Sequence, residues 1–270
     1  MSLVRVGLVG CGTIGVRLAL TVQREYSTVA TMTALHDVVP AQALRLQARL
    51  RSHPSVVSLP TLIRTSQLII EAASAAVVPE VVSRALRAGR HVLVMSVGGL
   101  LRERAWQRLA TGSKAKVYIP SGALAGLDGI KAMAVGHIRR VSLTTSKPPR
   151  ALSGSPYVKR RKLDLGHLRR PTIIFEGSAR AVVEAFPQNT NVAAALTLAS
   201  GVSAQRTRVR VVADPSLRMN VHELDVESDC GRIHCRIESR ASSNPKTSEL
   251  AVRSAVASLR RLFDAVAIGT

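Results

Sequence analysis

A strand-like stretch that runs directly into three glycines constrains this chain more than any other feature. The stretch "LVRVGLV" (3–9) is followed by Gly10, Gly12 and Gly15 in Gly-x-Gly-x-x-Gly spacing, where a helical pattern begins. The first glycine permits a tight turn, the second lets the backbone approach a pyrophosphate, and the third allows close helix packing. The helix N-terminus adds N–H groups and a positive dipole for the anion. We therefore expect a dinucleotide to lie against Gly10, Cys11, Gly12, Thr13 and Ile14.

Asp37 is the acid that such a turn requires. It ends the strand-like stretch "TVATMTALHD", about 20 residues beyond Gly15. A carboxylate at this place accepts hydrogen bonds from the adenosine ribose and disfavours a 2′-phosphate. His36 could still tolerate a phosphate, and Val38 stands where an arginine would favour one. We expect NAD as the cofactor, with NADP as the alternative. A glycine turn that only packs a helix is the remaining interpretation.

Residues 1–120 alternate short apolar strands with helical patterns. The strand-like stretches "QLIIEAA", "HVLVMS" and "KVYIP" are separated by segments such as "PEVVSRALRAG". Pro40 and Pro79 stand at expected helix starts, and Gly89 stands at a helix end. The alternation predicts βαβ units on a parallel sheet, which is an α/β protein with a Rossmann dinucleotide-binding domain.

The pattern changes near residue 121, after which strands dominate. They are "HIRRVSLTT", "PTIIFE", "RTRVRVVAD", "RMNVHELDVES" and "GRIHCRIES", with helices expected near 178–186 and 191–200. Short connections favour an antiparallel or mixed sheet, so we expect a second, α+β domain over 121–243 that carries the substrate. Residues 244–270 are expected to form a helix that packs back on the first domain. Its expected cap is Thr247 or Ser248, and its expected buried residues are Leu250, Val256, Leu259 and Phe263.

The basic charge of the chain raises nucleic acid as a partner. The sequence has 38 Lys and Arg against 17 Asp and Glu, a net charge of +21, and a basic surface attracts any polyanion. However, Arg206, Arg208 and Arg210 alternate with other residues as on a strand with one solvated face. The dense basic run over 159–170 lacks the stacking aromatics of an RNA-binding module. Nucleic acid is therefore a disfavoured partner, and the charge is interpreted as incidental or as steering an anion.

Two further classes are disfavoured by the sequence. No apolar run approaches the roughly 20 residues needed to cross a bilayer, and the N-terminus lacks the regions of a signal peptide. We expect a cytoplasmic protein with no membrane partner. The three cysteines, Cys11, Cys230 and Cys235, lack zinc-ligand spacing, so no metal is expected.

The residues that could carry chemistry lie in the second half of the chain. In "RMNVHELDVE", Asn220 and His222 share one face of a strand. An imidazole titrates near neutral pH and can pass a proton, although a structural histidine fits this pattern as well. "TTSKPPR" places Lys147 in a rigid turn at a strand end, where a fixed ammonium would suit a carboxylate. In "FPQNTNVAAA", one of Asn189 and Asn191 is expected to cap a helix and the other to bind a ligand.

Seven stretches together resemble the L-aspartate dehydrogenase family, in order and at near-matching spacing. They are "GLVGCGTIG", "VMSVGGL", "YIPSGALAGLDGIKA", "TTSKPPRAL", "FEGSARAVVEAFPQNTNVAAAL", "VVADPSLRMNVHEL" and "NPKTSELAVRSAVASL". The resemblance covers essentially the whole chain. It implies a Rossmann domain, a smaller α+β domain with the nicotinamide at their interface, and a homodimer. It also implies an active-site role for His222 and cofactor contacts at Ala123 and Asn189. Ala73, Ser96 and Val97 are the other cofactor contacts that we expect.

The implied reaction is the NAD(P)-dependent oxidation of L-aspartate to iminosuccinate, which hydrolyses to oxaloacetate and ammonia, or the reverse reductive amination. Iminosuccinate is a precursor of quinolinate, so the resemblance also implies a place in NAD biosynthesis. His222 and Asn220 are the expected catalytic residues: His222 acts as a base towards the amine or towards water, and Asn220 orients it or the substrate. Lys147, Asn220 and Ser121 are expected to hold the two carboxylates. Val38 in place of an arginine, Ala125 in place of a glycine and the +21 charge depart from the family pattern. The alternatives are a related amino-acid dehydrogenase or imine reductase with another substrate, and a non-catalytic nucleotide- or nucleic-acid-binding relative.

Overall fold

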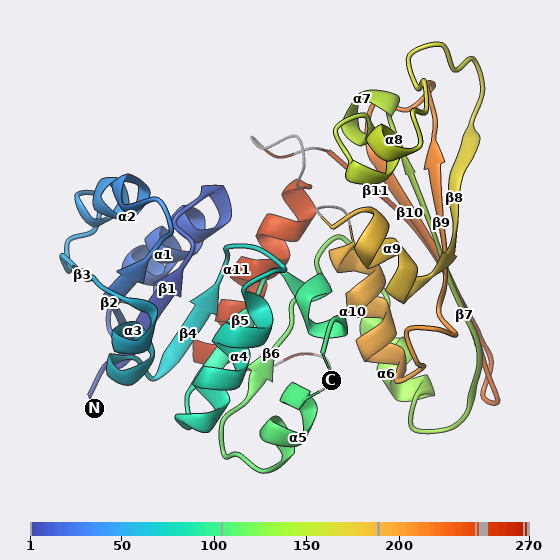
Figure 1. The fold of residues 1–270 in the computed structure, drawn as a ribbon. Coiled ribbons are helices and arrows are strands. Elements are labelled where there is room, and N and C mark those ends of the chain that lie inside the picture. The colour runs from blue at the N-terminus through green and yellow to red at the C-terminus, as the bar shows by residue number, and fades with distance from the viewer. Residues whose placement is uncertain are drawn as a thin grey trace. The chain divides into compact units, whose positions relative to one another are not determined.

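The chain forms two compact units, shown in Figure 1. The computed structural model describes residues 2–103, 105–187, 190–240, 242, 248–266 and 268. The first unit comprises residues 1–120 and 255–267, and the second comprises residues 121–254 and 268–270. Among the residues so described, no helix combines the length and apolar composition needed to span a bilayer.

The sheet of the first unit is parallel, as predicted. Its strands lie in the order β3-β2-β1-β4-β5-β6, and every described pair is parallel. The strands are β1 (Val4–Val9), β2 (Ala30–His36), β3 (Ser55–Val56), β4 (Leu68–Glu71), β5 (His91–Val94) and β6 (Val117–Tyr118). All residues of β4 are buried, which is typical of a parallel strand covered on both faces. The strand order reverses between β1 and β4, and open α/β sheets bind dinucleotides beyond the carboxyl ends of their strands at such a switch point.

Helices cover both faces of this sheet. They are α1 (Thr13–Glu25), α2 (Pro40–Gln47), α3 (Leu59–Thr65), α4 (Val78–Arg87), α5 (Ala105–Thr111) and the 3-10 helix η1 (Val97–Leu101). Leu8 of β1 packs with Leu18 of α1 in the core, whereas a Cβ at Gly7 would lie 2.7 Å from the Leu62 side chain of α3. The predicted punctuation is confirmed: a proline lies in the first two positions of α2 and of α4, and Gly89 has a φ of +67° after α4.

The last helix, α11 (Glu249–Phe263), begins at a serine cap and contributes to the first unit. Ser248 Oγ accepts a hydrogen bond of 3.1 Å from Ala251 N, so Ser248 takes the capping role; Thr247 lies outside the described residues. Ala255 and Leu259 are fully buried in the core of the first unit, with Val256 and Phe263 packed against it. The expectation for Leu250 was wrong, because it is 37% exposed; it precedes the part of α11 that joins this core.

The second unit contains a mixed sheet, as predicted, with strand order β11-β10-β7-β9-β8. The strands are β7 (Ile138–Lys147), β8 (Thr172–Ser178), β9 (Arg208–Ala213), β10 (Asn220–Ser228) and β11 (Arg232–Ser239). The described pair β7–β9 is parallel and the other described pairs are antiparallel. The helices are α6 (Leu127–Met133), α7 (Pro149–Leu152), α8 (Pro156–Arg160), α9 (Ala179–Ala185) and α10 (Asn191–Ser200). Helices α9 and α10 therefore occupy the two places predicted for them.

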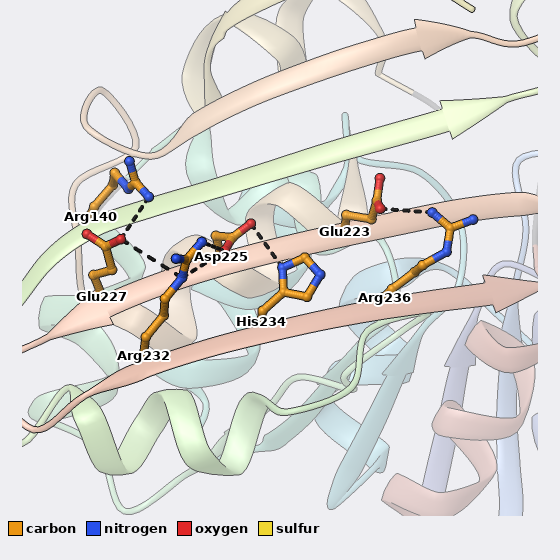
Figure 2. Close-up of polar contacts among 7 residues, drawn as sticks. All are labelled: Arg140, Glu223, Asp225, Glu227, Arg232, His234 and Arg236. Carbon is orange, nitrogen blue, oxygen red and sulfur yellow. Dashed lines mark hydrogen bonds and ion pairs between the residues drawn. The ribbon is translucent and has the colours of Figure 1, made fainter.

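One face of this sheet is covered by charged side chains that pair across the strands, as Figure 2 shows. Arg140 of β7 lies 2.8 Å from Glu227 of β10, and Arg236 of β11 lies 2.8 Å from Glu223 of β10. Such exposed pairs contribute little stability, at most about 1 kcal/mol each. They do neutralise part of the basic charge on this face. Because side chains alternate along a strand, the even-numbered residues of β10, including His222, point to the other face.

Candidate active site

The glycine turn between β1 and α1 is shaped by the absence of side chains. Gly10 has a φ of +93°, and a Cβ there would lie 2.6 Å from the Ala73 nitrogen. A Cβ at Gly15 would lie 2.0 Å from the Gly10 carbonyl oxygen. By contrast, nothing lies within 4 Å of a Cβ built on Gly12. The first and third glycines are therefore required for packing, and the second leaves open space at the N-terminus of α1, where no side chain caps the helix.

Asp37 is fixed beside this turn by backbone N–H groups. Its Oδ2 accepts a hydrogen bond of 2.7 Å from Cys11 N, and its Oδ1 accepts one of 2.8 Å from Val39 N. Each carboxylate oxygen keeps a second lone pair for a further donor. The Cys11 thiol is buried, and burial together with the Asp37 charge raises the pKa of Cys11 to about 12. Cys11 therefore presents its backbone rather than a reactive thiolate to this site.

Sequence reasoning missed Glu71, the last residue of β4. Its side chain is fully buried. Oε1 accepts a hydrogen bond of 2.9 Å from Ala73 N, and Oε2 accepts one of 2.9 Å from Ser96 N. Burial raises the pKa of the Glu71 carboxyl, and hydrogen bonds from the Ser96 and Ala73 backbones oppose that rise. Ala73 and Ser96, two of the expected cofactor contacts, thus lie on the two turns that this one carboxylate joins, and the expected contact Val97 begins η1 directly after Ser96.

The second unit brings four polar side chains together on neighbouring strands. Thr145 of β7 faces His222 of β10 in the register of the sheet, and its Oγ1 lies 3.1 Å from His222 Nδ1. One pleat further along, the same register places Lys147 level with Asn220, since Ser146 pairs with Val221. All four side chains are buried. The strand period of two puts them on one face, so Asn220 and His222 share one face of β10, as predicted.

The structure changes two expectations about the basic residues of this block. Lys147 lies at a strand end, as expected, but within the strand rather than in the turn after it: it is the last residue of β7, pairs with Ala213 of β9 and is 6% exposed. Burial lowers the pKa of Lys147 to about 8. His222 does not titrate near neutral pH, because burial and the nearby Lys147 charge lower the pKa of His222 to about 3. At neutral pH His222 is therefore an uncharged imidazole, and Lys147 is the basic group whose charge changes near physiological pH.

A small cavity of about 10 Å³ adjoins this block. Thr145, Lys147 and Thr190 contribute its polar lining, and apolar side chains such as Phe186 form the rest. Its volume is on the order of that needed for one water. Thr190 is buried, and its Oγ1 has no hydrogen-bond partner within the described part of the chain. Sequence reasoning missed Thr190 because the two flanking asparagines were the stronger signal.

The remaining predicted residues lie at the start of the second unit and before α10. Ser121 and Ala123 lie on the turn that precedes α6, where Leu124 N donates a hydrogen bond of 3.2 Å to the Ser121 carbonyl; the Ala123 side chain is buried. Thr190 is the N-cap residue of α10 and Asn191 is its first residue, so Asn191 does not occupy the cap position. Asn189 lies outside the described residues. No three His, Cys, Asp or Glu side chains in the described segments gather closely enough to hold a metal ion.

Comparison with known proteins identifies both halves of the chain. Residues 10–119 match the family model "Homoserine dehydrogenase, NAD binding domain", and residues 128–262 match "Aspartate dehydrogenase, C-terminal". The fold is similar to the crystal structure of aspartate dehydrogenase from Thermotoga maritima, with a TM-score of 0.74, 24% identity and full coverage of both chains.

Curated relatives match over nearly their whole length. The L-aspartate dehydrogenase of Methanosarcina barkeri is 41% identical over 99% of this chain and 100% of its own. That of Bradyrhizobium diazoefficiens is 35% identical over 100% of this chain and 95% of its own. These matches agree with the glycine turn, the parallel sheet and the second, mixed sheet. The chain therefore belongs to the L-aspartate dehydrogenase family of oxidoreductases.

Proposed function

We propose that this protein interconverts L-aspartate and iminosuccinate with a nicotinamide dinucleotide, and thereby L-aspartate and oxaloacetate plus ammonia. The observation that carries the proposal is the buried block of Thr145, Lys147, Asn220 and His222, in a chain that also has the glycine turn of a dinucleotide site. A buried ammonium at Lys147, a neutral imidazole and an amide on one face offer several hydrogen-bond donors to a small dicarboxylate.

The residues of the first unit fit the dinucleotide. The open space over Gly12 and the uncapped N-terminus of α1 suit a pyrophosphate. Asp37 suits ribose hydroxyls and repels a 2′-phosphate, so we propose NAD as the preferred cofactor over NADP. When bound, the nicotinamide accepts the hydride from the amino-acid Cα or returns it to the imine.

In the second unit, Lys147 and Asn220 are proposed to hold the substrate. With a pKa of about 8, Lys147 is mostly an ammonium at pH 7 and in that form can bind one carboxylate of the substrate; only its minor amine form can take a proton from the substrate ammonium. Asn220, on the same face, offers neutral donors to that ligand, and Ser121 is proposed to bind the second carboxylate. In this arrangement the specificity for two carboxylates rests on fixed donors rather than on pocket size alone.

Proton transfer is assigned differently from the sequence expectation. Before hydride leaves Cα, the substrate ammonium must lose a proton. A base with a pKa of about 3, as His222 has, accepts it poorly, whereas the amine form of Lys147 accepts it well. His222, with Nδ1 paired to the Thr145 hydroxyl, keeps Nε2 for a hydrogen bond to the substrate. We therefore propose His222 as a neutral hydrogen-bonding group and Lys147 as the proton carrier.

The test follows oxidation of NADH and of NADPH with oxaloacetate in the presence and absence of ammonia, with pyruvate and 2-oxoglutarate as competing ketoacids. Ammonia-dependent turnover of oxaloacetate, faster with NADH and lost in Lys147→Met, is expected. Equal rates with pyruvate would contradict the substrate, and faster turnover with NADPH would contradict the cofactor. We also propose a homodimer, for which light scattering should give twice the chain mass, and release of iminosuccinate for quinolinate formation in NAD biosynthesis.

A further inference from the structure

The carboxylate of Glu71 joins two turns that are far apart in the sequence. It accepts one hydrogen bond from Ala73 N, in the turn after β4, and one from Ser96 N, in the turn after β5, both at 2.9 Å. Glu71 is fully buried, and a buried carboxylate is stable only when its oxygens are hydrogen-bonded. The acid and the two turns therefore depend on each other for their conformation.

The same turn after β4 also touches the glycine turn. A Cβ on Gly10 would lie 2.6 Å from both the Ala72 carbonyl and the Ala73 nitrogen. The backbone of Ala73 is thus fixed on one side by Gly10 and on the other by Glu71. Through Glu71, Ser96 is fixed relative to the glycine turn as well.

Strand order shows which part of the cofactor this arrangement would serve. Asp37 follows β2, the glycine turn follows β1, Ala73 follows β4 and Ser96 follows β5, and these strands are neighbours in the order β2-β1-β4-β5. With adjacent strands about 4.8 Å apart, the four carboxyl ends span roughly 14 Å, comparable to an extended dinucleotide. Asp37 and the glycine turn occupy the end suited to the adenosine and pyrophosphate. The turns held by Glu71 occupy the other end.

We propose that Glu71 is a positioning residue for the nicotinamide half of the dinucleotide, which it serves by holding the turns at Ala73 and Ser96 in place. This inference rests on the proposed dinucleotide binding. It distinguishes Glu71 from the residues of the glycine turn and from Asp37, which serve the adenosine half. Glu71 itself acts through the two backbones and needs no contact with the cofactor.

The informative variant is Glu71→Gln, which keeps the shape of the side chain. A glutamine offers one carbonyl oxygen and one NH₂ group, so it can accept from only one of the two backbone N–H groups. The other backbone N–H then faces the NH₂ group of the glutamine, which cannot accept a hydrogen bond. The turn that carries this N–H is therefore no longer held in place. We expect the Kd for NADH to rise at least tenfold, while the Kd for ADP-ribose, which lacks the nicotinamide, changes less than twofold.

The experiment measures the Kd of both ligands by calorimetry for wild type, Glu71→Gln, Asp37→Ala and Glu80→Gln, with thermal unfolding of each. Glu80 is an exposed glutamate of α4 whose partner is Arg84, so its variant controls for loss of a carboxylate. Asp37→Ala should weaken both ligands. Equal affinities of wild type and Glu71→Gln for NADH, or an equal loss of both ligands in Glu71→Gln, would overturn the positioning role alone. Failure of the wild type to bind either ligand would instead overturn the proposed cofactor, and the positioning role with it.

Discussion

Replacing Lys147 by methionine should make the protein more stable and less active. Methionine has a similar length and no charge, so Lys147→Met removes a buried ammonium without opening a large cavity. In the wild type that ammonium is 6% exposed at the end of β7. The buried ammonium lowers the free energy of unfolding, and this loss should depend on pH because lysine titrates and methionine does not.

The magnitude follows from the pKa of Lys147, which burial lowers from 10.5 to about 8. Each pKa unit corresponds to about 1.4 kcal/mol, so the buried charge costs about 3 kcal/mol. Between pH 8 and 10.5 the unfolded chain binds the lysine proton and the folded chain does not, so wild-type stability rises with pH in this window. Below pH 8 the full cost is present, and above 10.5 it is gone.

The assay is urea unfolding of wild type and Lys147→Met at pH 7 and at pH 9.5. We expect the variant to be more stable by up to about 3 kcal/mol at pH 7, and the difference to shrink by about 2 kcal/mol at pH 9.5. Lys159→Met, at an exposed position of α8, should change stability by less than about 0.5 kcal/mol. A stability difference for Lys147→Met that is the same at both pH values would refute the assignment of a buried, titrating lysine.

Three other changes test the two halves of the site. Burial lowers the pKa of His222 from 6.5 to about 3, so between these pH values the unfolded chain binds a proton that the folded chain does not. Acidification from pH 7 to 4 should therefore lower the unfolding free energy of the wild type by about 3 kcal/mol through this residue. In urea unfolding, His222→Gln should lose about 3 kcal/mol less than the wild type over this range, and an equal loss in both proteins would contradict the buried neutral imidazole. A Cβ on Gly15 would lie 2.0 Å from the Gly10 oxygen, so Gly15→Ala should destabilise by about 1–3 kcal/mol and abolish NADH binding in calorimetry. A Cβ on Gly154 would have nothing within 4 Å, so Gly154→Ala should change neither stability nor NADH binding. Loss of stability in Gly154→Ala with none in Gly15→Ala would contradict the packing role of Gly15. Asp37→Ser removes the charge that repels a 2′-phosphate, so the ratio of NADPH to NADH affinity should rise at least tenfold, and an unchanged ratio would exclude Asp37 as the discriminating residue.

Local requirements made the first unit predictable from sequence. A φ of +93° at Gly10 and the contact of Gly15 with the turn leave no room for a side chain, so the motif itself carries the geometry. Asp37 could be found because its distance from the glycines is set by one βαβ unit. The apolar alternation predicted the strand types and the change to a mixed sheet near residue 121, because the period of the pattern differs between helix and strand.

The features that sequence reasoning missed all depend on contacts between distant segments. Glu71 stands at the end of a strand-like run, where a glutamate gives no signal of burial. Its role depends on hydrogen bonds from Ala73 N and Ser96 N, which lie in turns far apart in the sequence. Lys147 precedes two prolines, which predicted a rigid turn, yet it is the last residue of β7, and pairing with β9 buries it. The neutral state of His222 likewise follows from burial beside Lys147, and a strand pattern does not report burial of that depth.

The most direct test of the proposed reaction is isotope transfer in a single incubation. Oxaloacetate, ¹⁵N-ammonia and NADH carrying deuterium on both C4 positions are incubated with the protein, and the product is analysed by mass spectrometry. We predict L-aspartate that is two mass units heavier, with one deuterium at Cα and one ¹⁵N. Deuterated malate without ¹⁵N would instead show reduction of the ketoacid itself, and would contradict the assignment of an amino-acid dehydrogenase.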